Sequence, residues 1–385
     1  MPAFPGRERR LRSAPGRFVV VDRGSGRFHG RRTTGAEWAT FGRVKGRAEN
    51  TGSKRVSRDH EPGWAREVEP STEARPTVIF LAGSTACGKT DLAIDLAARL
   101  PLDLISVDSG QVYRELNIGT AKPSANLLEK FPHGLIDIRR LDQPFSAAEF
   151  CQEAHKLIGQ SFGRGRTPLL VGGTMFYFSA LLNGLSNLPP ADARLRAKFQ
   201  QRAARQGWPA LHHWLEEMDP VAASRINPVD AQRISRALEI NLLSGAPVSA
   251  GRPGRGLGER GVRVVQACLS IPHRECLHRR ITRRLEQMLN AGLIDEVTQI
   301  RDAYPGASVF PSLRSVGYRQ IWEYLDGKTD YSCMLDRVQS ATRRLAKRQL
   351  TWLRNQPGNV WFDATDPRLN VGITQFLNAC GAING

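Results

Sequence analysis

Residues 83–90 read Gly83-Ser84-Thr85-Ala86-Cys87-Gly88-Lys89-Thr90, which is the spacing of a phosphate-binding loop. The apolar residues 77–81 predict a strand before this loop, and residues 91–97 predict a helix after it. In that context the backbone N–H groups of the loop and the helix N-terminus form a cradle for a polyphosphate. Lys89 would add a positive charge, and the Thr90 hydroxyl would be a ligand for Mg2+. The sequence therefore predicts a ligand with a diphosphate or a longer chain, and leaves open what the protein does with it.

Composition restricts the class of protein. The chain has 385 residues, of which 41% are hydrophobic, so it can form a substantial core, and no stretch approaches the ~18 apolar residues of a membrane helix. The net charge is +18, and the excess of Lys and Arg is not confined to residues 1–76. Such a surface favours a polyanionic partner, with nucleic acid as the first candidate and an ordinary solvated basic surface as the alternative. The scattered cysteines contain no C-x2-C pair and indicate reduced thiols of a cytoplasmic protein.

The order of elements predicts the fold. Residues 1–76 are rich in Gly and Arg without hydrophobic periodicity, which predicts a disordered basic extension. Later strands are expected at residues 104–107, 167–171 and 262–270, with helices at 175–182 and 275–289. This alternation predicts an α/β fold with a parallel sheet of the phosphate-loop type, whose ligands bind at the carboxyl ends of the strands. The core would comprise residues 77–188 and 256–370, and residues 371–385 would form a tail.

A small all-helical insertion domain is predicted at residues 189–255, where the alternation stops. Trp208, Leu211, Leu215 and Met218 follow helical spacing. Asp230 has the position of a cap for a second helix that runs to residue 243.

Two polar positions follow predicted strands. Asp108 follows the second strand, close to where the phosphate loop opens, and three roles remain possible: a magnesium-binding acid, a general base facing a second substrate, or a cap of the next helix. Thr174 follows Gly172 and Gly173, which allow a substrate to approach the backbone closely. Its hydroxyl could bond that substrate or cap the following helix.

Arginines cluster on two predicted helices. One helix carries Arg279, Arg280, Arg283 and Arg284, of which Arg280 and Arg284 share a face that could hold phosphate oxygens. Residues 341–354 form the densest basic helix, with no acidic residue and with a Trp nearby. This pattern suits a nucleic-acid backbone, and a solvated surface is the alternative for both helices.

The chain resembles the tRNA dimethylallyltransferases, also called tRNA isopentenyltransferases, over residues 77–365. Six motifs occur in the family's order, and those at 105–123, 230–240 and 341–354 are specific in combination. The matching stretches are GSTACGKT (83–90), ISVDSGQVYRELNIGTAKP (105–123), PLLVGGTMFYFSALLNGL (168–185), DAQRISRALEI (230–240), LRSVGYRQIWEYL (313–325) and ATRRLAKRQLTWLR (341–354). Two departures are the extension 1–76, which has no counterpart, and Cys87 in place of a more usual Ser.

The resemblance implies an activity and a set of roles. The enzyme would transfer a dimethylallyl group from dimethylallyl diphosphate to N6 of adenosine 37, in tRNAs that read codons beginning with U. It would act as a cytoplasmic monomer on the anticodon stem-loop. Residues 83–90 would hold the donor's diphosphate, with Thr90 on Mg2+. Asp108 would be the general base, Thr174 would lie beside the reacting base, and Arg280 would stabilise the diphosphate, although its alignment among the four arginines is open.

The resemblance also implies positions that contact tRNA. These are Asp108, Ser109, Gly110, Gln111, Arg196, Gln232, Arg233, Ile234, Ser235, Arg236, Arg314, Tyr318, Arg319, Lys347, Arg348 and Arg354. Three rival functions remain at this point. A small-molecule kinase would bind ATP at the loop, an adenylate prenyltransferase would modify AMP or ADP, and a non-catalytic RNA-binding protein would use only the basic helices.

Overall fold

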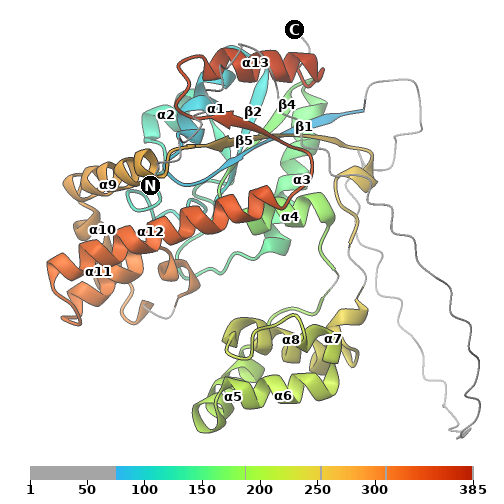
Figure 1. Ribbon diagram of the computed structural model, residues 1–385, viewed down its shortest axis with the longest axis vertical. Coiled ribbons are helices and arrows are strands. Elements are labelled where there is room, and N and C mark those ends of the chain that lie inside the picture. The colour runs from blue at the N-terminus through green and yellow to red at the C-terminus, as the bar shows by residue number, and fades with distance from the viewer. Residues whose placement is uncertain (1–74, 187, 252–253, 308–309, 384–385) are drawn as a thin grey trace, which may run out of the picture. The chain divides into compact units, whose positions relative to one another are not determined.

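The computed structural model describes residues 75–186, 188–251, 254–307 and 310–383, so nearly all of the predicted extension 1–76 lies outside the described residues. Within these ranges the core is a parallel sheet (Figure 1), and its strand order is β3-β2-β4-β1-β5-β6. The strands are β1 (Thr77–Gly83), β2 (Leu102–Val107), β3 (His133–Gly134), β4 (Thr167–Gly172), β5 (Arg263–Ser270) and β6 (Asn359–Asp363). The predicted parallel α/β core is confirmed.

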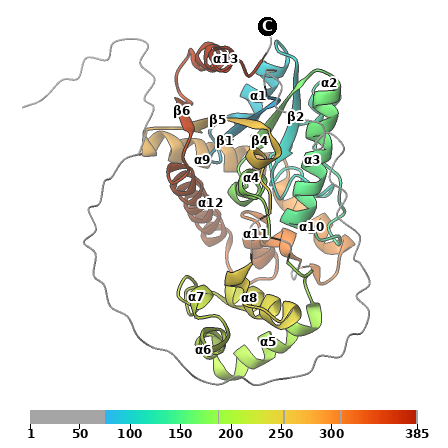
Figure 2. The ribbon, with the colours of Figure 1, turned by 90° about the vertical axis from the view of Figure 1, so that its right-hand side faces the viewer.

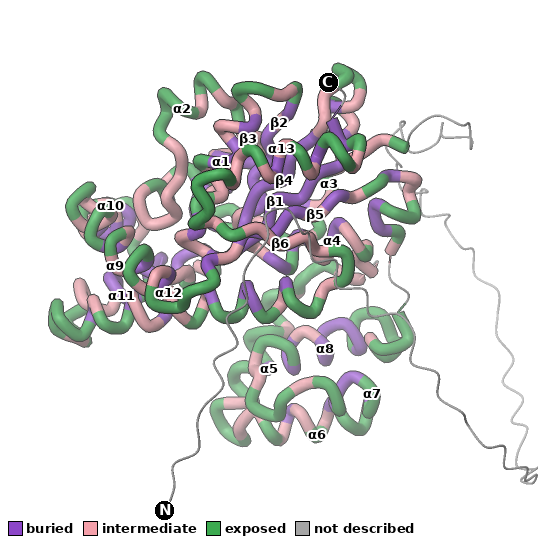
Figure 3. The backbone as a smooth tube through the Cα atoms, turned by 45° about the horizontal axis from the view of Figure 1, so that its top comes forward, coloured by how far each residue is buried: buried purple, intermediate pink, exposed green. Residues whose placement is uncertain are grey.

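Helices cover both faces of this sheet because its central strands are apolar on both sides. Ile79 and Leu81 of β1 belong to one buried cluster with α1 and α13, whereas Phe80 between them packs its ring 4.9 Å from that of Phe178 in α4. Figures 1 and 2 show the two layers, and Figure 3 shows the buried strands between exposed helices. The helices of the first half are α1 (Lys89–Ala97), α2 (Ala125–Lys130), α3 (Ala147–Gly163) and α4 (Met175–Asn183).

The register brings three strand ends to one place. Ala82 of β1 and Val107 of β2 both pair with Gly172 of β4. The phosphate loop after β1, residues 108–111 after β2 and residues 173–174 after β4 therefore leave the same edge of the sheet. This edge is where a parallel α/β sheet binds its ligands.

A second group of helices follows β5. They are α9 (Arg274–Asn290), α10 (Leu293–Ala303), α11 (Tyr318–Leu325) and α12 (Tyr331–Arg354). The long helix α12 packs against α9 and α11, and also reaches α4 and β1. Its buried residues recur at helical spacing, among them Val338, Ala346 and Leu350. The basic segment 341–354 is therefore the C-terminal part of α12, and one side of it packs in the protein core.

The insertion predicted at 189–255 is helical. It contains α5 (Ala193–Gln206), α6 (Trp208–Met218), α7 (Pro220–Ala223) and α8 (Ala231–Ser244) around their own apolar cluster. Asp230 caps α8, as predicted, by accepting a hydrogen bond from the Arg233 backbone N–H at 3.1 Å. The two connections to the core touch through glycines, since a Cβ on Gly184 would lie 2.1 Å from the Gly254 carbonyl oxygen.

The final segment differs from its prediction. Residues 371–385 were expected to be a tail, but α13 (Leu369–Ala379) packs on the sheet. Ile373 and Leu377 are almost fully buried there, and Ala382 and Ile383 join the same cluster. This short amphipathic helix completes the face of the sheet that α1 also covers.

Candidate active site

The phosphate loop has the backbone conformation that an anion cradle requires. Ala86 and Gly88 have φ of 63° and 83°, and Gly88 precedes α1 without any side-chain cap. The first N–H groups of α1 therefore have no side-chain acceptor, and the positive end of the helix dipole faces the loop. The Lys89 ammonium folds over the loop and donates to the carbonyl oxygens of Gly83 and Ser84 at 3.1 and 2.7 Å.

Asp108 stabilises a turn rather than a helix. Its Oδ1 accepts hydrogen bonds from the backbone N–H groups of Gly110 at 2.8 Å and Gln111 at 3.3 Å. No helix begins within residues 109–113, so the helix-cap interpretation is wrong. Its other oxygen, Oδ2, accepts no hydrogen bond from any described residue. The carboxylate is thus oriented through one oxygen and can accept a proton on the other.

Thr174 lies next to Asp108 in space. Its Oγ1 accepts a hydrogen bond from the Ser109 backbone N–H at 3.0 Å and donates to Ser109 Oγ at 3.4 Å. It makes no side-chain cap on α4, so of the two roles open to it the cap is wrong. Gln111 shapes the same region, because its Oε1 accepts from Ser106 Oγ and its Nε2 donates to the carbonyl oxygens of Thr120 and Ala121.

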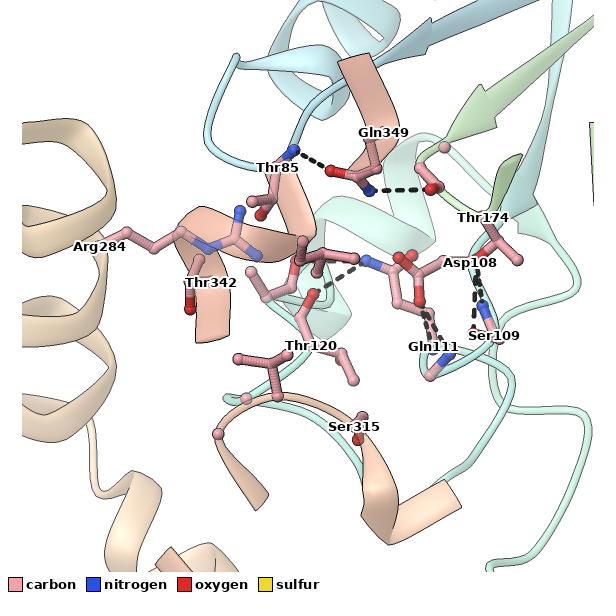
Figure 4. Close-up of a pocket in the computed structure, with 18 of the residues that line it drawn as sticks. Thr85, Asp108, Ser109, Gln111, Thr120, Thr174, Arg284, Ser315, Thr342 and Gln349 are labelled. Carbon is pink, nitrogen blue, oxygen red and sulfur yellow. Dashed lines mark hydrogen bonds between the residues drawn. The ribbon is translucent and has the colours of Figure 1, made fainter. Parts of the chain in front are cut away.

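Gln349 of α12 is a site residue that sequence reasoning missed. Its Oε1 accepts from the Thr85 backbone N–H in the phosphate loop, and its Nε2 donates to the Gly173 carbonyl oxygen, both at 2.8 Å. Figure 4 shows this amide between Thr85 and Thr174. The available signal was a polar residue on the buried stripe of a basic helix, between Ala346 and Leu350.

Among the four arginines of α9, the structure places Arg284 at the site. Arg284 lines the cavity, whereas Arg279, Arg280 and Arg283 are exposed and do not. Burial lowers the pKa of the Arg284 guanidinium, and the Asp108 carboxylate acts in the opposite direction. An arginine nevertheless stays charged at neutral pH. The choice of Arg280 is therefore corrected to Arg284, one helical turn later, which Figure 4 shows reaching into the site.

These groups surround a cavity of about 600 Å³. One side is polar and is formed by the phosphate loop, Asp108 and Thr174. Another part is apolar and comes mainly from α9 and α12. Its lining residues include Ile281, Leu285, Met288, Leu293, Val316, Val338 and Leu345. Phe176, which is 62% exposed, and Arg348 also line the cavity.

The residues predicted to contact tRNA divide into three groups. Ser109, Gly110, Gln111, Arg314 and Arg348 line the cavity together with Asp108. Gln232, Arg233, Arg319, Lys347 and Arg354 are exposed. The others have internal roles, because Ile234 and Tyr318 are fully buried, Ser235 is 8% exposed, and Arg196 and Arg236 bind the buried Glu239 carboxylate. In this conformation the side chains of Ile234 and Ser235 offer almost no surface to tRNA, and those two predictions are corrected, whereas Tyr318 lines the cavity and its contact with tRNA stays a prediction.

Tyr318 holds the wall of the cavity. Its hydroxyl donates to Glu296 at 2.6 Å, and the same carboxylate accepts from the backbone N–H groups of Asn117, Ile118 and Gly119. A Cβ on Gly119 would lie 2.5 Å from the Tyr318 ring. The loop that leads to Thr120 is thereby fixed against α10 and α11.

The fold and site define an α/β protein in which a phosphate-binding loop opens into one cavity with a lone carboxylate and a threonine. A sequence profile described as IPP transferase matches residues 111–356. The tRNA dimethylallyltransferase of Cupriavidus taiwanensis is 51% identical over 300 residues, which cover 75% of this chain and 92% of that protein. The one from Thiobacillus denitrificans is 50% identical over 295 residues, covering 76% and 93%. The chain therefore belongs to the IPP transferase family, among the tRNA dimethylallyltransferases.

Solved structures agree with this assignment. The full-length tRNA isopentenylpyrophosphate transferase of Bacillus halodurans is 38% identical, with a TM-score of 0.58 over 80% of this chain and 97% of that one. A eukaryotic dimethylallyltransferase described as acting on tRNA shares the fold, with a TM-score of 0.64 at 24% identity and 79% coverage of each chain. Among the described residues, no helix has the length and apolar character needed to cross a membrane.

Proposed function

We propose that this protein transfers a dimethylallyl group from dimethylallyl diphosphate to N6 of adenosine 37 in tRNAs that read codons beginning with U. The supporting observation is that one cavity contains both the phosphate loop and the Asp108 carboxylate, whose Oδ2 accepts no hydrogen bond from the described residues. In this proposal the diphosphate lies in the loop, the five-carbon chain lies in the apolar part, and the purine amine lies near Asp108 and Thr174. The proposal places the enzyme in the cytoplasm, as a monomer bound to the anticodon stem-loop.

The donor half of the reaction needs stabilisation of a departing diphosphate. An allylic carbon ionises readily because its cation is delocalised, so negative charge develops mainly on the leaving group. The N–H groups of the loop, Lys89 and Arg284 are fixed positive groups around that charge. Such preorganised groups commonly make the largest contribution to lowering a reaction barrier.

Mg2+ fits this site as a metal held largely by the substrate. The Thr90 hydroxyl lines the cavity at the start of α1. No cluster of three or more His, Cys, Asp or Glu side chains suited to a metal occurs among the described residues. Mg2+ is commonly bound by one or two protein oxygens together with phosphates and water, so Thr90 and the diphosphate form a sufficient set. When bound, Mg2+ would neutralise charge on the leaving diphosphate.

The acceptor half needs a weak nucleophile to be placed and deprotonated. The exocyclic amine of adenine is conjugated with its ring and becomes acidic as it forms a bond to carbon. Asp108 Oδ2 is the acceptor for that proton, and the hydrogen bonds to Oδ1 hold the carboxylate in place. The amine reaches a buried cavity only if the base leaves its stack, which is easiest in a single-stranded loop.

The test is transfer of label from radioactive dimethylallyl diphosphate to tRNA by the purified full chain. We expect N6-isopentenyladenosine by nucleoside mass spectrometry from a tRNA with adenosine at position 37, and none from the same tRNA with guanosine there. Product from free AMP in place of tRNA would instead support the adenylate prenyltransferase. ATP consumption without RNA would support a kinase, and binding of tRNA without any product would contradict the assignment as a transferase.

A further inference from the structure

Gln349 occupies a place where a polar side chain is costly unless it is fully bonded. It is 7% exposed and lies on the inner side of α12, among apolar residues. Both ends of its amide are used, through the 2.8 Å bonds to the Thr85 N–H and the Gly173 carbonyl. An aliphatic residue would fill this stripe more simply, so the amide has a specific use.

The two partners of Gln349 belong to the two halves of the site. Thr85 is part of the loop proposed to hold diphosphate. Gly173 precedes Thr174, whose hydroxyl bonds the residue after Asp108. The hydrogen bonds of Gln349 and Thr174, joined by the Gly173–Thr174 peptide bond, thus connect the phosphate loop to the segment that carries the proposed base. The fit is close, because a Cβ on Gly173 would lie 2.5 Å from Gln349 Nε2.

Gln349 also determines which backbone N–H groups of the phosphate loop can bind a phosphate. The Thr85 N–H points to the amide oxygen, so it is not available to a phosphate. The diphosphate must therefore be held by the later N–H groups, towards Gly88 and the start of α1. The bond thus favours one placement of the leaving group in the loop.

We propose that Gln349 is a positioning residue, which sets the separation and orientation of the donor diphosphate site relative to the acceptor site. This inference rests on the proposed prenyl transfer. Its physical basis is that the reacting carbon and nitrogen must meet at about 3–3.5 Å, and that a misplacement of about 1 Å can cost 10²-fold in rate. Gln349 touches neither reacting atom, so its effect is on the turnover step more than on binding.

The experiment compares Gln349→Met, of similar length but without hydrogen bonds, with Gln339→Met. Gln339 lies on the same helix outside the cavity, where its Oε1 accepts from Thr282 and Arg343. We expect kcat to fall at least tenfold for Gln349→Met, with KM for tRNA and for dimethylallyl diphosphate within threefold of wild type. Gln339→Met should keep kcat within twofold of wild type. Its Tm shows how much a Gln-to-Met substitution in this helix changes stability by itself.

A second variant covers the case in which Gln349→Met does not fold. In Gln349→Glu the carboxylate still accepts from the Thr85 N–H but cannot donate to Gly173, so kcat should again fall at least tenfold. A kcat within twofold of wild type for either folded variant overturns the inference. So does a loss seen only as a raised KM. An inactive wild-type protein would refute the proposed function itself, which keeps the two failures distinct.

Discussion

Asp108→Asn separates the observed role of Asp108 in its turn from its proposed role as the general base. Asparagine keeps an Oδ1 that accepts from the Gly110 and Gln111 N–H groups, so the turn is retained. Only the negative charge and the basicity are lost. General base catalysis contributes about 10²–10⁴-fold, which corresponds to about 3–5 kcal/mol of barrier. We therefore expect the single-turnover rate constant to fall by about that factor while the free energy of unfolding stays within about 0.5 kcal/mol of wild type.

The assay is single-turnover transfer of label from dimethylallyl diphosphate to saturating tRNA, which reports chemistry rather than product release. Asp108→Ala is the matched comparison, because it removes the acceptor of both backbone N–H groups as well. Each lost bond costs about 0.5–1.5 kcal/mol, so this variant should be less stable by about 1–3 kcal/mol. Its turnover should be no faster than that of Asp108→Asn.

One result would refute the reasoning. If Asp108→Asn turns over within about threefold of wild type while Asp108→Ala is both slow and unstable, then the carboxylate serves the turn alone. The proton would then leave to another acceptor, and the assignment of Asp108 as the base would be wrong.

Three further predictions follow from the site and the insertion. Arg284→Ala should lower kcat at least tenfold, because a cation beside the diphosphate is lost, whereas the exposed Arg280→Ala should stay within about threefold; equal losses would contradict the choice of Arg284. Phe176→Ala should raise the KM for tRNA about tenfold with the donor KM unchanged, because its exposed ring at the cavity can stack on a base, and Phe176→Tyr should restore it. Burial opposes ionisation of Glu239, but hydrogen bonds from Arg196 and Arg236 outweigh it and lower its pKa from the usual 4.5. Stability from this lowered pKa is complete above about pH 4.5 and is lost as pH falls through the folded value, so wild-type Tm should drop more steeply in acid than that of Glu239→Gln.

The core of the fold was predictable because its signals are local. The strand, loop and helix around residues 83–90 lie within a continuous segment, and short runs of mostly apolar residues mark β2, β4 and β5. Several elements were not predicted, and for two of them, β6 and α13, the reason can be identified. β6 is a five-residue strand that is only partly buried, and α13 is short, with an apolar side that packs in the same cluster as α1. The start of α3 was a missed local signal, since Ser146 and Glu149 form a capping box.

The site was less predictable because it is assembled from distant segments. The spacing placed Arg280 and Arg284 on one face of a helix. The sequence does not show which of these two neighbouring turns lies beside the phosphate loop. Ile234 and Ser235 show a different problem, because the family motif includes them but both side chains are buried. A residue within an RNA-binding motif can be a buried core residue that holds the motif in shape. The motif sequence alone does not show which of its residues are buried.

The phosphate loop does not by itself decide the chemistry, because hydrolases and kinases use the same loop. The chemistry depends on the residues that line the rest of the cavity beside the loop. Here that space is bounded by apolar residues of α9, including Ile281 and Leu285, and by one carboxylate. A hydrolase needs ordered water at that place, and an allylic cation must be kept from water. The apolar lining from α9 and α12 therefore suits a carbon substituent on the diphosphate better than an attacking water, which supports the proposal that Asp108 accepts a proton from the second substrate.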